Sequence, residues 1–250
     1  MVESRPVTQA LESPPAALPG GPDRTMAAIE VVLCSGFPTQ LALVQLLALA
    51  GFQPLDTDGR LSIGYVWTLS LLDAVLLIGL ILLFLRLHSE SPRAMFLGGR
   101  PIVPEGLVGV ALTPVIFVLA LGSLAVIRAL VPWLHNVPTN PLADLLSTRI
   151  GLWLFLVIAI VAGGIREELQ RAFILRRFED HLGGAVFGLV LFSLVFGAGH
   201  LLQGRDTAIV TALLGATWGA VYLVRRSVVA PGVSHAVFNV SQILGYLAST

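Results

Sequence analysis

The chain has 250 residues, of which 56% are hydrophobic and only 12% are charged, and its formal net charge is zero. A soluble domain carries about 25% charged residues, so this composition excludes an ordinary soluble protein and predicts a polytopic protein of the lipid bilayer. The zero net charge removes any general case for nucleic acid as a partner, and the single cysteine, Cys34, excludes a disulfide framework.

The first 25 residues differ from the rest of the chain. Residues 1–25 combine proline, glycine, alanine and serine with scattered charges, and they lack the apolar core of a signal peptide. They predict a disordered N-terminal tail. Residues 26–148 are expected to hold N-terminal transmembrane helices, and residues 149–250 a second group of helices that carries the polar motifs.

Seven stretches are apolar over about the 20 residues that a membrane-spanning helix needs. They predict an all-α, polytopic membrane helix bundle with seven transmembrane helices, or eight if the long third stretch contains two. The stretches lie at about 27–52, 62–87, 104–132, 149–175, 185–204, 207–224 and 228–248.

The arginines predict how these helices are oriented. The second, fourth and sixth connections carry two or three arginines each, for example Arg86, Arg93 and Arg100, whereas the other three carry one each. By the positive-inside rule, the even-numbered connections and the N-terminal tail lie in the cytoplasm, and the C-terminus lies outside.

Three polar clusters interrupt the apolar stretches of the C-terminal half. They comprise Glu167, Glu168 and Arg171 in the fourth stretch, His200 in the fifth, and His235 and Asn239 in the seventh. Ionisable side chains at membrane depth are costly, so each is a candidate for a functional site. Glu167 and Arg171 are four residues apart, as are His235 and Asn239, so each pair lies on one helix face.

The spacing predicts that these clusters meet. We expect the turn between the fourth and fifth stretches at His181–Gly184, with Glu167 and His200 each about 16 residues, or roughly 24 Å, from it. His235 follows Arg226 by nine residues, which places it about 13 Å below the cytoplasmic interface. Glu167 precedes Arg176 by the same nine residues, so the two depths agree, provided that Arg176–Asp180 continue the fourth helix into the cytoplasm.

Such a set of residues could hydrolyse a carbonyl compound. A carboxylate that faces a neutral imidazole can hold and deprotonate a water molecule, and side-chain N–H donors can stabilise an oxyanion. We therefore assign Glu167 as general base, His200 as its partner on the water, and His235 with Asn239 as oxyanion donors. Arg171 would orient the glutamates and balance their charge.

Other polar residues have a plainer interpretation. The sequence identifies no partner for Asp73, Glu30 or Arg128, and the remaining histidines, at positions 88, 135 and 181, are expected to be solvated. The chain has no His-Glu-x-x-His and no Gly-x-Ser-x-Gly motif. Ser234 precedes His235 directly, and adjacent helix residues do not face each other, which argues against a serine mechanism.

At the three clusters the chain resembles the CPBP family of membrane proteases, which includes CAAX prenyl proteases and ABI-type, bacteriocin-processing proteins. That family shows Glu-Glu-x-x-x-Arg, then Phe-x-x-x-His, then His-x-x-x-Asn or Asp. The matching residues, within about 149–248, are Glu167-Glu168 and Arg171, Phe196 and His200, and His235 and Asn239.

The first motif is one residue shorter than the family pattern. If it is aligned on the arginine, Arg166 occupies the first, usually catalytic, position. If it is aligned on the glutamate pair, Glu167 keeps that position. We prefer the second alignment because it places Glu167 level with His200, and Glu168 is the rival candidate.

The resemblance implies an intramembrane endopeptidase of the plasma membrane, bacterial in origin, with its active site open to the cytoplasm. Its partners would be the lipid bilayer and a peptide or membrane-protein substrate. A zinc ion held by Glu167, His200 and His235 and a metal-free glutamate site both fit these residue types. The alternative is a non-catalytic membrane scaffold or a bacteriocin-immunity-type binding protein.

Overall fold

The computed structural model describes residues 21–249, and they form helices with a single isolated β-bridge, between Leu55 and Leu61. The α-helices are α1 (Arg24–Leu33), α2 (Phe37–Leu49), α3 (Ile63–Leu87), α4 (Pro92–Leu97), α5 (Ile102–Leu130), α6 (Arg149–Ile158), α7 (Glu167–His181), α8 (Ala185–Ala198), α9 (Arg205–Arg225) and α10 (Val229–Ser249). A π-helical segment, η4 (Ala159–Arg166), joins α6 to α7, and short 3₁₀ turns are η2 (Pro132–Leu134), η3 (Pro141–Leu146) and η5 (Leu201–Gln203). The all-α prediction is confirmed.

Every stretch predicted to span the membrane is helical in the structure. Four described helical segments are long and apolar enough to cross a bilayer, one of them being the continuous run of α6, η4 and α7, and the pair α1 and α2, bent by 42°, counts as a fifth if it forms one span. The apolar helix α8 has only 14 residues. The third stretch forms the one continuous helix α5, so the structure gives no eighth span there. The count of seven crossings stays a prediction.

Side chains at the helix starts explain several boundaries. Asp23 caps α1, Ser62 caps α3 and Thr148 caps α6, each accepting a hydrogen bond from a backbone N–H of the first turn. Of the predicted tail, residues 1–20 lie outside the described residues, and α1 already begins at Arg24. The predicted turn is confirmed, because α7 ends at His181 and α8 begins at Ala185.

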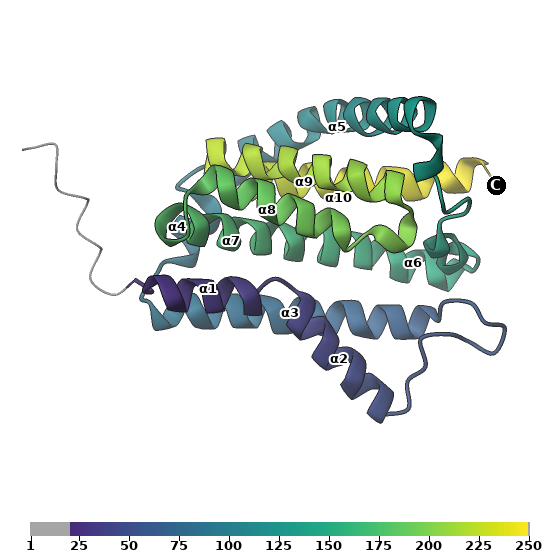
Figure 1. The fold of residues 1–250 in the computed structure, drawn as a ribbon, viewed down its shortest axis with the longest axis horizontal. Helices are drawn as coiled ribbons and strands as arrows, with labels where there is room; N and C mark the ends of the chain where they lie inside the picture. Colours follow the sequence, from purple (N-terminus) through teal and green to yellow (C-terminus); the bar gives the residue numbers. More distant parts are fainter. Residues whose placement is uncertain (1–20, 250) are drawn as a thin grey trace, which may run out of the picture.

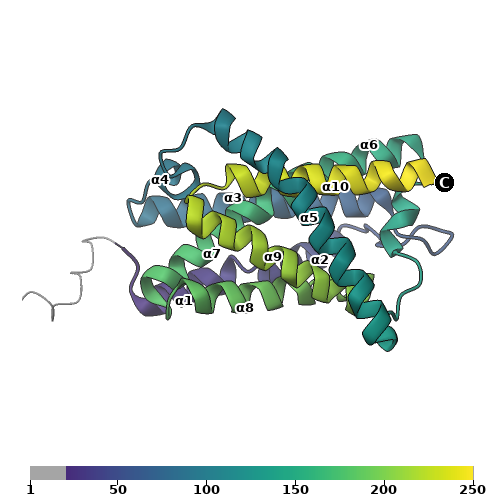
Figure 2. The ribbon, with the colours of Figure 1, turned by 90° about the horizontal axis from the view of Figure 1, so that it is seen from above.

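The helices surround α7 (Figure 1). Helices α1 and α3 lie on one side of it, and α8, α9 and α10 lie on the other, with α5 outermost. Seen from above, α5 crosses over α9 and α10 at a steep angle (Figure 2). Helix α2 turns away from the bundle after the break that follows α1 (Figure 1).

Two apolar cores hold this arrangement. The first joins α7 to α1, α3, α4, α8 and α9, and it includes Leu77, Phe84, Phe173, Phe192 and Tyr222. The second joins α5, α9 and α10 through residues such as Ile116, Trp218 and Phe238. Because α7 is covered on both sides, its charged side chains Glu168, Arg171 and Arg177 are buried as well.

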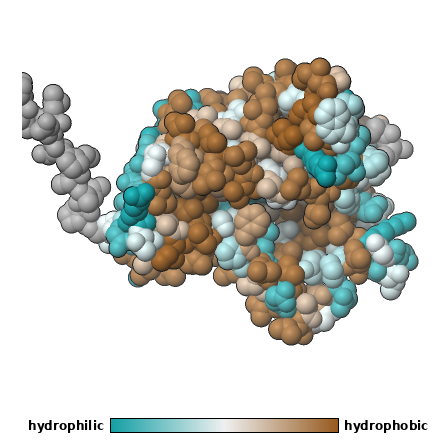
Figure 3. Space-filling view, in the orientation of Figure 1, coloured by the Kyte–Doolittle hydropathy of each residue, from teal (hydrophilic) through white to brown (hydrophobic). Residues whose placement is uncertain are grey.

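The outer surface agrees with a protein of the bilayer. Apolar residues cover most of the face seen in Figure 3, and hydrophilic residues gather toward its two ends. Exposed apolar side chains of this kind have a favourable environment in lipid rather than in water.

Several charged residues have partners that the sequence did not identify. Glu30 contacts His88 and Arg177, each at 2.5 Å, so His88 is not a freely solvated histidine. Asp206 contacts both Arg128 and His135 at 2.9 Å. Each pair joins residues far apart in the chain, which is why sequence spacing could not predict it.

Candidate active site

The two glutamates stand at the start of α7, directly after the π-helical segment η4. π-Helical turns inside longer helices are rare and are frequent at functional sites. Two glycines of η4 lie against α10: a Cβ at position 163 would lie 2.5 Å from Asn239 Nδ2, and a Cβ at position 164 would lie 2.7 Å from Ala236 Cβ. Their missing side chains allow α10 to approach the glutamates.

Glu168 is buried and bound to its neighbours through one oxygen, Oε1, while Oε2 has no hydrogen-bond partner in the described part of the chain. Its side chain is 2% exposed, and Oε1 accepts hydrogen bonds from the Arg171 guanidinium and, at 2.9 Å, from Nδ1 of His235. Because a carboxylate can only accept, Nδ1 of His235 carries the proton. Glu168 therefore orients the imidazole of His235.

Glu167 has a more open environment. Its side chain is 17% exposed, and its oxygens lie 3.8 Å from His235 Nε2 and 3.8 Å from Arg166 Nη1. Both distances exceed hydrogen-bond length. Glu167 is therefore the more accessible carboxylate of the pair, and neither cation beside it is hydrogen-bonded to it.

Arg171 lies in an aromatic enclosure formed by α8 and α9. The centre of its guanidinium is 4.9 Å from the ring of Phe196, 5.8 Å from Phe192 and 5.9 Å from Trp218. The side chain is fully buried, and its Nε and Nη2 atoms have no hydrogen-bond partner in the described part of the chain. The faces of the rings therefore stabilise this charge together with Glu168.

His235 is held on a second side by an aromatic ring. The indole of Trp218 stacks on the imidazole with ring centres 3.9 Å apart and an angle of 16°. The indole Nε1 donates to Ser234 Oγ at 3.3 Å. Ser234 is thus used to position Trp218, which agrees with the argument against a serine mechanism.

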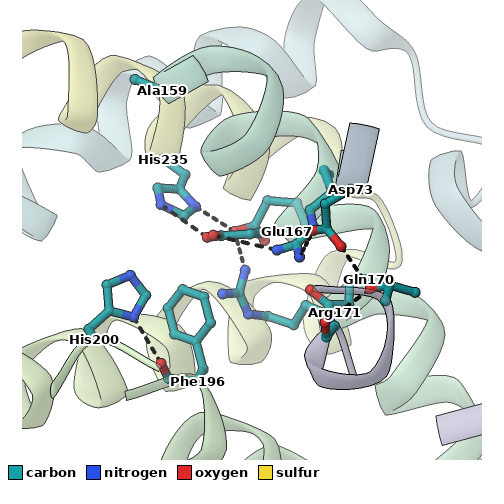
Figure 4. Close-up of polar contacts among 12 residues, drawn as sticks. Asp73, Ala159, Glu167, Gln170, Arg171, Phe196, His200 and His235 are labelled. Atoms are coloured by element: carbon teal, nitrogen blue, oxygen red, sulfur yellow. Dashed lines mark hydrogen bonds and ion pairs between the residues drawn. The ribbon is translucent and has the colours of Figure 1, made fainter. Parts of the chain in front are cut away.

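His200 stands at the end of α8, apart from the glutamates (Figure 4). Its Nδ1 lies 2.9 Å from the carbonyl oxygen of Phe196. A carbonyl can only accept, so Nδ1 carries the proton and Nε2 of a neutral His200 is left as an acceptor. The ring of Phe196 contacts both His200, at 5.0 Å between centres, and Arg171.

Asn239 lies one turn beyond His235 on α10. Its Nδ2 donates a long hydrogen bond, 3.4 Å, to the carbonyl oxygen of Ala159 at the start of η4. Since the amide nitrogen has two hydrogens, one remains for another acceptor.

A buried ion pair that the sequence did not predict completes the cluster. Arg166 binds Asp73 of α3, and the other oxygen of Asp73 accepts from Thr39 Oγ1 at 2.7 Å. The sequence identified no partner for Asp73, and the structure supplies two, Arg166 and Thr39. The available signal was a lone acid in an otherwise apolar helix, which is costly unless paired.

The structure thus gathers Glu167, Glu168, Arg171 and His235 into one group, which we call the central cluster together with Arg166 and Asp73. His200 and Asn239 stand at its border, each bonded to a backbone carbonyl. The histidine nearest to Glu167 is His235 rather than His200. Sequence reasoning also missed Trp218, for which an apolar stretch offered no specific signal.

The metal alternative can be tested on the arrangement of donors. Within residues 21–249, no group of three or more histidine, cysteine, aspartate or glutamate side chains has the geometry of a metal site. His235 lies within 4 Å of Glu167, whereas His200 stands apart from both of them (Figure 4). These residues as arranged do not fit the zinc set of Glu167, His200 and His235, and we derive no step through a metal.

The pairing of acids with arginines distinguishes the two glutamates of the central cluster. Its three acids face two arginines, and each arginine binds one acid: Arg171 binds Glu168, and Arg166 binds Asp73. Glu167 is the acid without a hydrogen-bonded counterion, since Arg166 Nη1 and His235 Nε2 each lie 3.8 Å from it. Two adjacent carboxylates in such different environments can serve different purposes, one structural and one as a base.

Comparison with known proteins agrees with the motifs. Residues 149–241 match the family model described as type II CAAX prenyl endopeptidase, Rce1-like. No curated protein matches the chain. No solved structure matches it. The family match confirms the resemblance to the CPBP proteases and contains all six predicted site residues.

Proposed function

Because residues 149–241 form an Rce1-like domain, we propose that this integral membrane protein is a CAAX-type intramembrane endopeptidase in which Glu167 activates the attacking water. The observation that carries the proposal is the contrast between the two glutamates. Glu168 is buried and bound by Arg171 and His235, whereas Glu167 is more exposed and is hydrogen-bonded to neither Arg166 nor His235, which lie 3.8 Å away.

In the proposed reaction, the Glu167 carboxylate removes a proton from water, and the resulting hydroxide attacks the carbonyl carbon of the scissile peptide bond. Nε2 of His200 accepts the second hydrogen bond of the water and orients it. The carbonyl oxygen becomes an oxyanion, which Nε2–H of a protonated His235 and the free amide hydrogen of Asn239 stabilise. The C–N bond then breaks, and the proton held by Glu167 passes to the leaving amine.

The surrounding residues position these groups. Glu168 and Trp218 hold the His235 ring from its edge and its face. Arg171 keeps Glu168 ionised so that it can accept from Nδ1 of His235. We place the site toward the cytoplasmic side of a bacterial plasma membrane, since α7 ends in the arginine-rich segment that the positive-inside rule assigns to the cytoplasm.

The test uses purified protein reconstituted in vesicles. Its probes are two synthetic peptides of the same sequence, one with a farnesylated cysteine three residues before its C-terminus and one without the lipid. We expect Glu167→Gln to lower kcat by about 100-fold or more, because a missing general base typically costs that much. Asp180→Asn, an exposed acid at the end of α7, is the control and should keep full activity.

The companion variants separate the roles of the residues. Glu168→Gln should lower both activity and thermal stability, since it leaves the buried Arg171 without its acid. His200→Gln and His235→Gln should lower kcat with little loss of stability. Full activity of the Glu167→Gln variant would overturn the assignment, and cleavage of neither peptide by the wild type would count against a CAAX-type substrate.

A further inference from the structure

Arg166 stands between two acids. Its guanidinium binds Asp73 of α3, and its Nη1 lies 3.8 Å from Glu167 Oε1 (Figure 4 shows this region). The side chain is only 9% exposed, so acids inside the protein rather than water balance its charge. The acid to which it binds therefore decides how much positive charge lies next to Glu167.

Asp73 is well placed to hold this arginine. Its side chain is buried, Oδ2 binds Arg166, and Oδ1 accepts from Thr39 Oγ1 at 2.7 Å. Thr39 belongs to α2 and Asp73 to α3, so both lie outside the segment that matches the protease family. The N-terminal helices thus contribute a contact directly beside the site.

We propose that Asp73 is a positioning residue that holds Arg166 away from Glu167 and so keeps Glu167 free to act as a base. The proposal rests on the function proposed above for Glu167. In a medium of low dielectric, a guanidinium that moves from 3.8 Å to full contact strengthens its attraction to a carboxylate considerably. Such contact would also occupy the oxygen atoms with which Glu167 must bind water.

The first test measures catalysis. Asp73→Asn should release Arg166 to Glu167, lower kcat about tenfold or more, and move the acidic limb of the kcat–pH profile to lower pH. The double variant Asp73→Asn with Arg166→Gln removes the competing charge. It should recover most of the lost kcat and return the limb to its wild-type position.

The second test does not depend on activity. Dicyclohexylcarbodiimide reacts with protonated carboxyl groups in apolar surroundings, and mass spectrometry locates the modified residue. At one fixed pH, labelling of Glu167 should fall about tenfold in Asp73→Asn and return in the double variant, because Arg166 keeps a bound carboxylate ionised. A purely structural role for Asp73 predicts the reverse, since loosened packing would expose Glu167.

A milder variant covers the case in which Asp73→Asn does not fold. Thr39→Val keeps both charges and removes the hydroxyl contacts to Asp73 and to the carbonyl oxygen of Gly36, and it should lower the labelling of Glu167 about twofold. Unchanged or increased labelling in a folded Asp73→Asn or Thr39→Val variant would overturn the proposal. If the wild type cleaves neither peptide, the proposed function fails, but the labelling still decides whether Asp73 controls Arg166.

Discussion

Arg171 has no exposed surface, and only one acid, Glu168, lies within ion-pair distance of it in the described part of the chain. Its remaining nitrogens face the rings of α8 and α9 rather than water. The free energy of such a buried pair depends on both partners staying in place, because each compensates for the lost hydration of the other.

We therefore expect Arg171→Met to destabilise the protein by roughly 3 kcal/mol, because it removes the permanent counterion of the buried Glu168 and leaves only His235 bonded to it. Thermal unfolding in detergent measures the effect. The double variant with Glu168→Gln should recover part of the stability.

Arg176→Met is the matched control on the same helix. Arg176 pairs with Glu179 and Asp180, but its side chain is 34% exposed. Partly exposed ion pairs contribute little, so the loss should stay below about 1 kcal/mol. Equal losses at the two positions would contradict the importance we give to burial.

At the scale of the elements, the crossing of η4 and α10 brings the glutamates and His235 together. The glycines that allow it are tightly packed: a Cβ at position 164 would lie 2.7 Å from Ala236 Cβ and 3.3 Å from the carbonyl oxygen of Gly232. A side chain there must push α10 away, and His235 and Asn239 would move with it.

Gly164→Ala should therefore destabilise the protein by about 1–3 kcal/mol, as overpacking does, and should lower kcat strongly. The control is Gly122→Ala in α5, where an added Cβ meets nothing within 4 Å. That change should be neutral or slightly stabilising, since alanine is the better helix former. Unfolding and cleavage assays on both variants, side by side, decide the point.

The segment between α1 and α2 also packs closely against the helices that carry the central cluster. Gln170 donates to the carbonyl oxygen of Cys34 at 2.7 Å. Gly36 has a φ of +90°, and a Cβ there would lie 3.1 Å from Arg166 Nη2. The break in this helix pair is thus seated on α7 and η4, next to the central cluster.

We expect Gly36→Ala to cost about 1–2 kcal/mol from its positive φ together with the close contact to Arg166. Gly51→Ala separates the two causes, because Gly51 also has a positive φ, +84°, but an added Cβ meets nothing within 4 Å. Only Gly36→Ala should also change kcat. Identical behaviour of both variants in unfolding and activity assays would show that the contact to Arg166 is unimportant.

At the scale of the whole molecule, α7 joins the two halves of the chain. Arg177 binds Glu30 of α1 and Glu90 of the segment after α3, and Arg166 binds Asp73. These acids neutralise arginines that lie in the family-matched half. Without them, that half would bury several charges without partners, each at a cost of several kcal/mol.

A chain divided between Thr139 and Asn140 tests this dependence. We expect residues 140–250 expressed alone to fail to form a soluble, monodisperse species in detergent. Co-expression with residues 1–139 should restore co-purification and cleavage activity, because the break lies in the connection between α5 and α6. Size-exclusion chromatography of a tagged fragment measures the outcome, and a stable fragment 140–250 would contradict the prediction.

The sequence by itself determined the class of the protein and where its candidate site residues stand in the chain. Long apolar stretches can satisfy their backbone hydrogen bonds in lipid only as helices, so the all-α fold and the positions of its helices followed from composition and length. Charged and polar groups inside such stretches are costly, so their positions alone were enough to single out Glu167, Glu168, Arg171, His200, His235 and Asn239.

The tertiary structure alone decided which of these groups meet. Helical spacing relates residues a few positions apart, but Asp73 and Arg166 are 93 positions apart and His235 and Glu168 are 67 apart. A π-helical turn also shifts the register of the side chains that follow it, and no residue pattern in the sequence predicted η4. For these reasons the pairing of each arginine with one acid, and the open position of Glu167, could be found only in the folded chain.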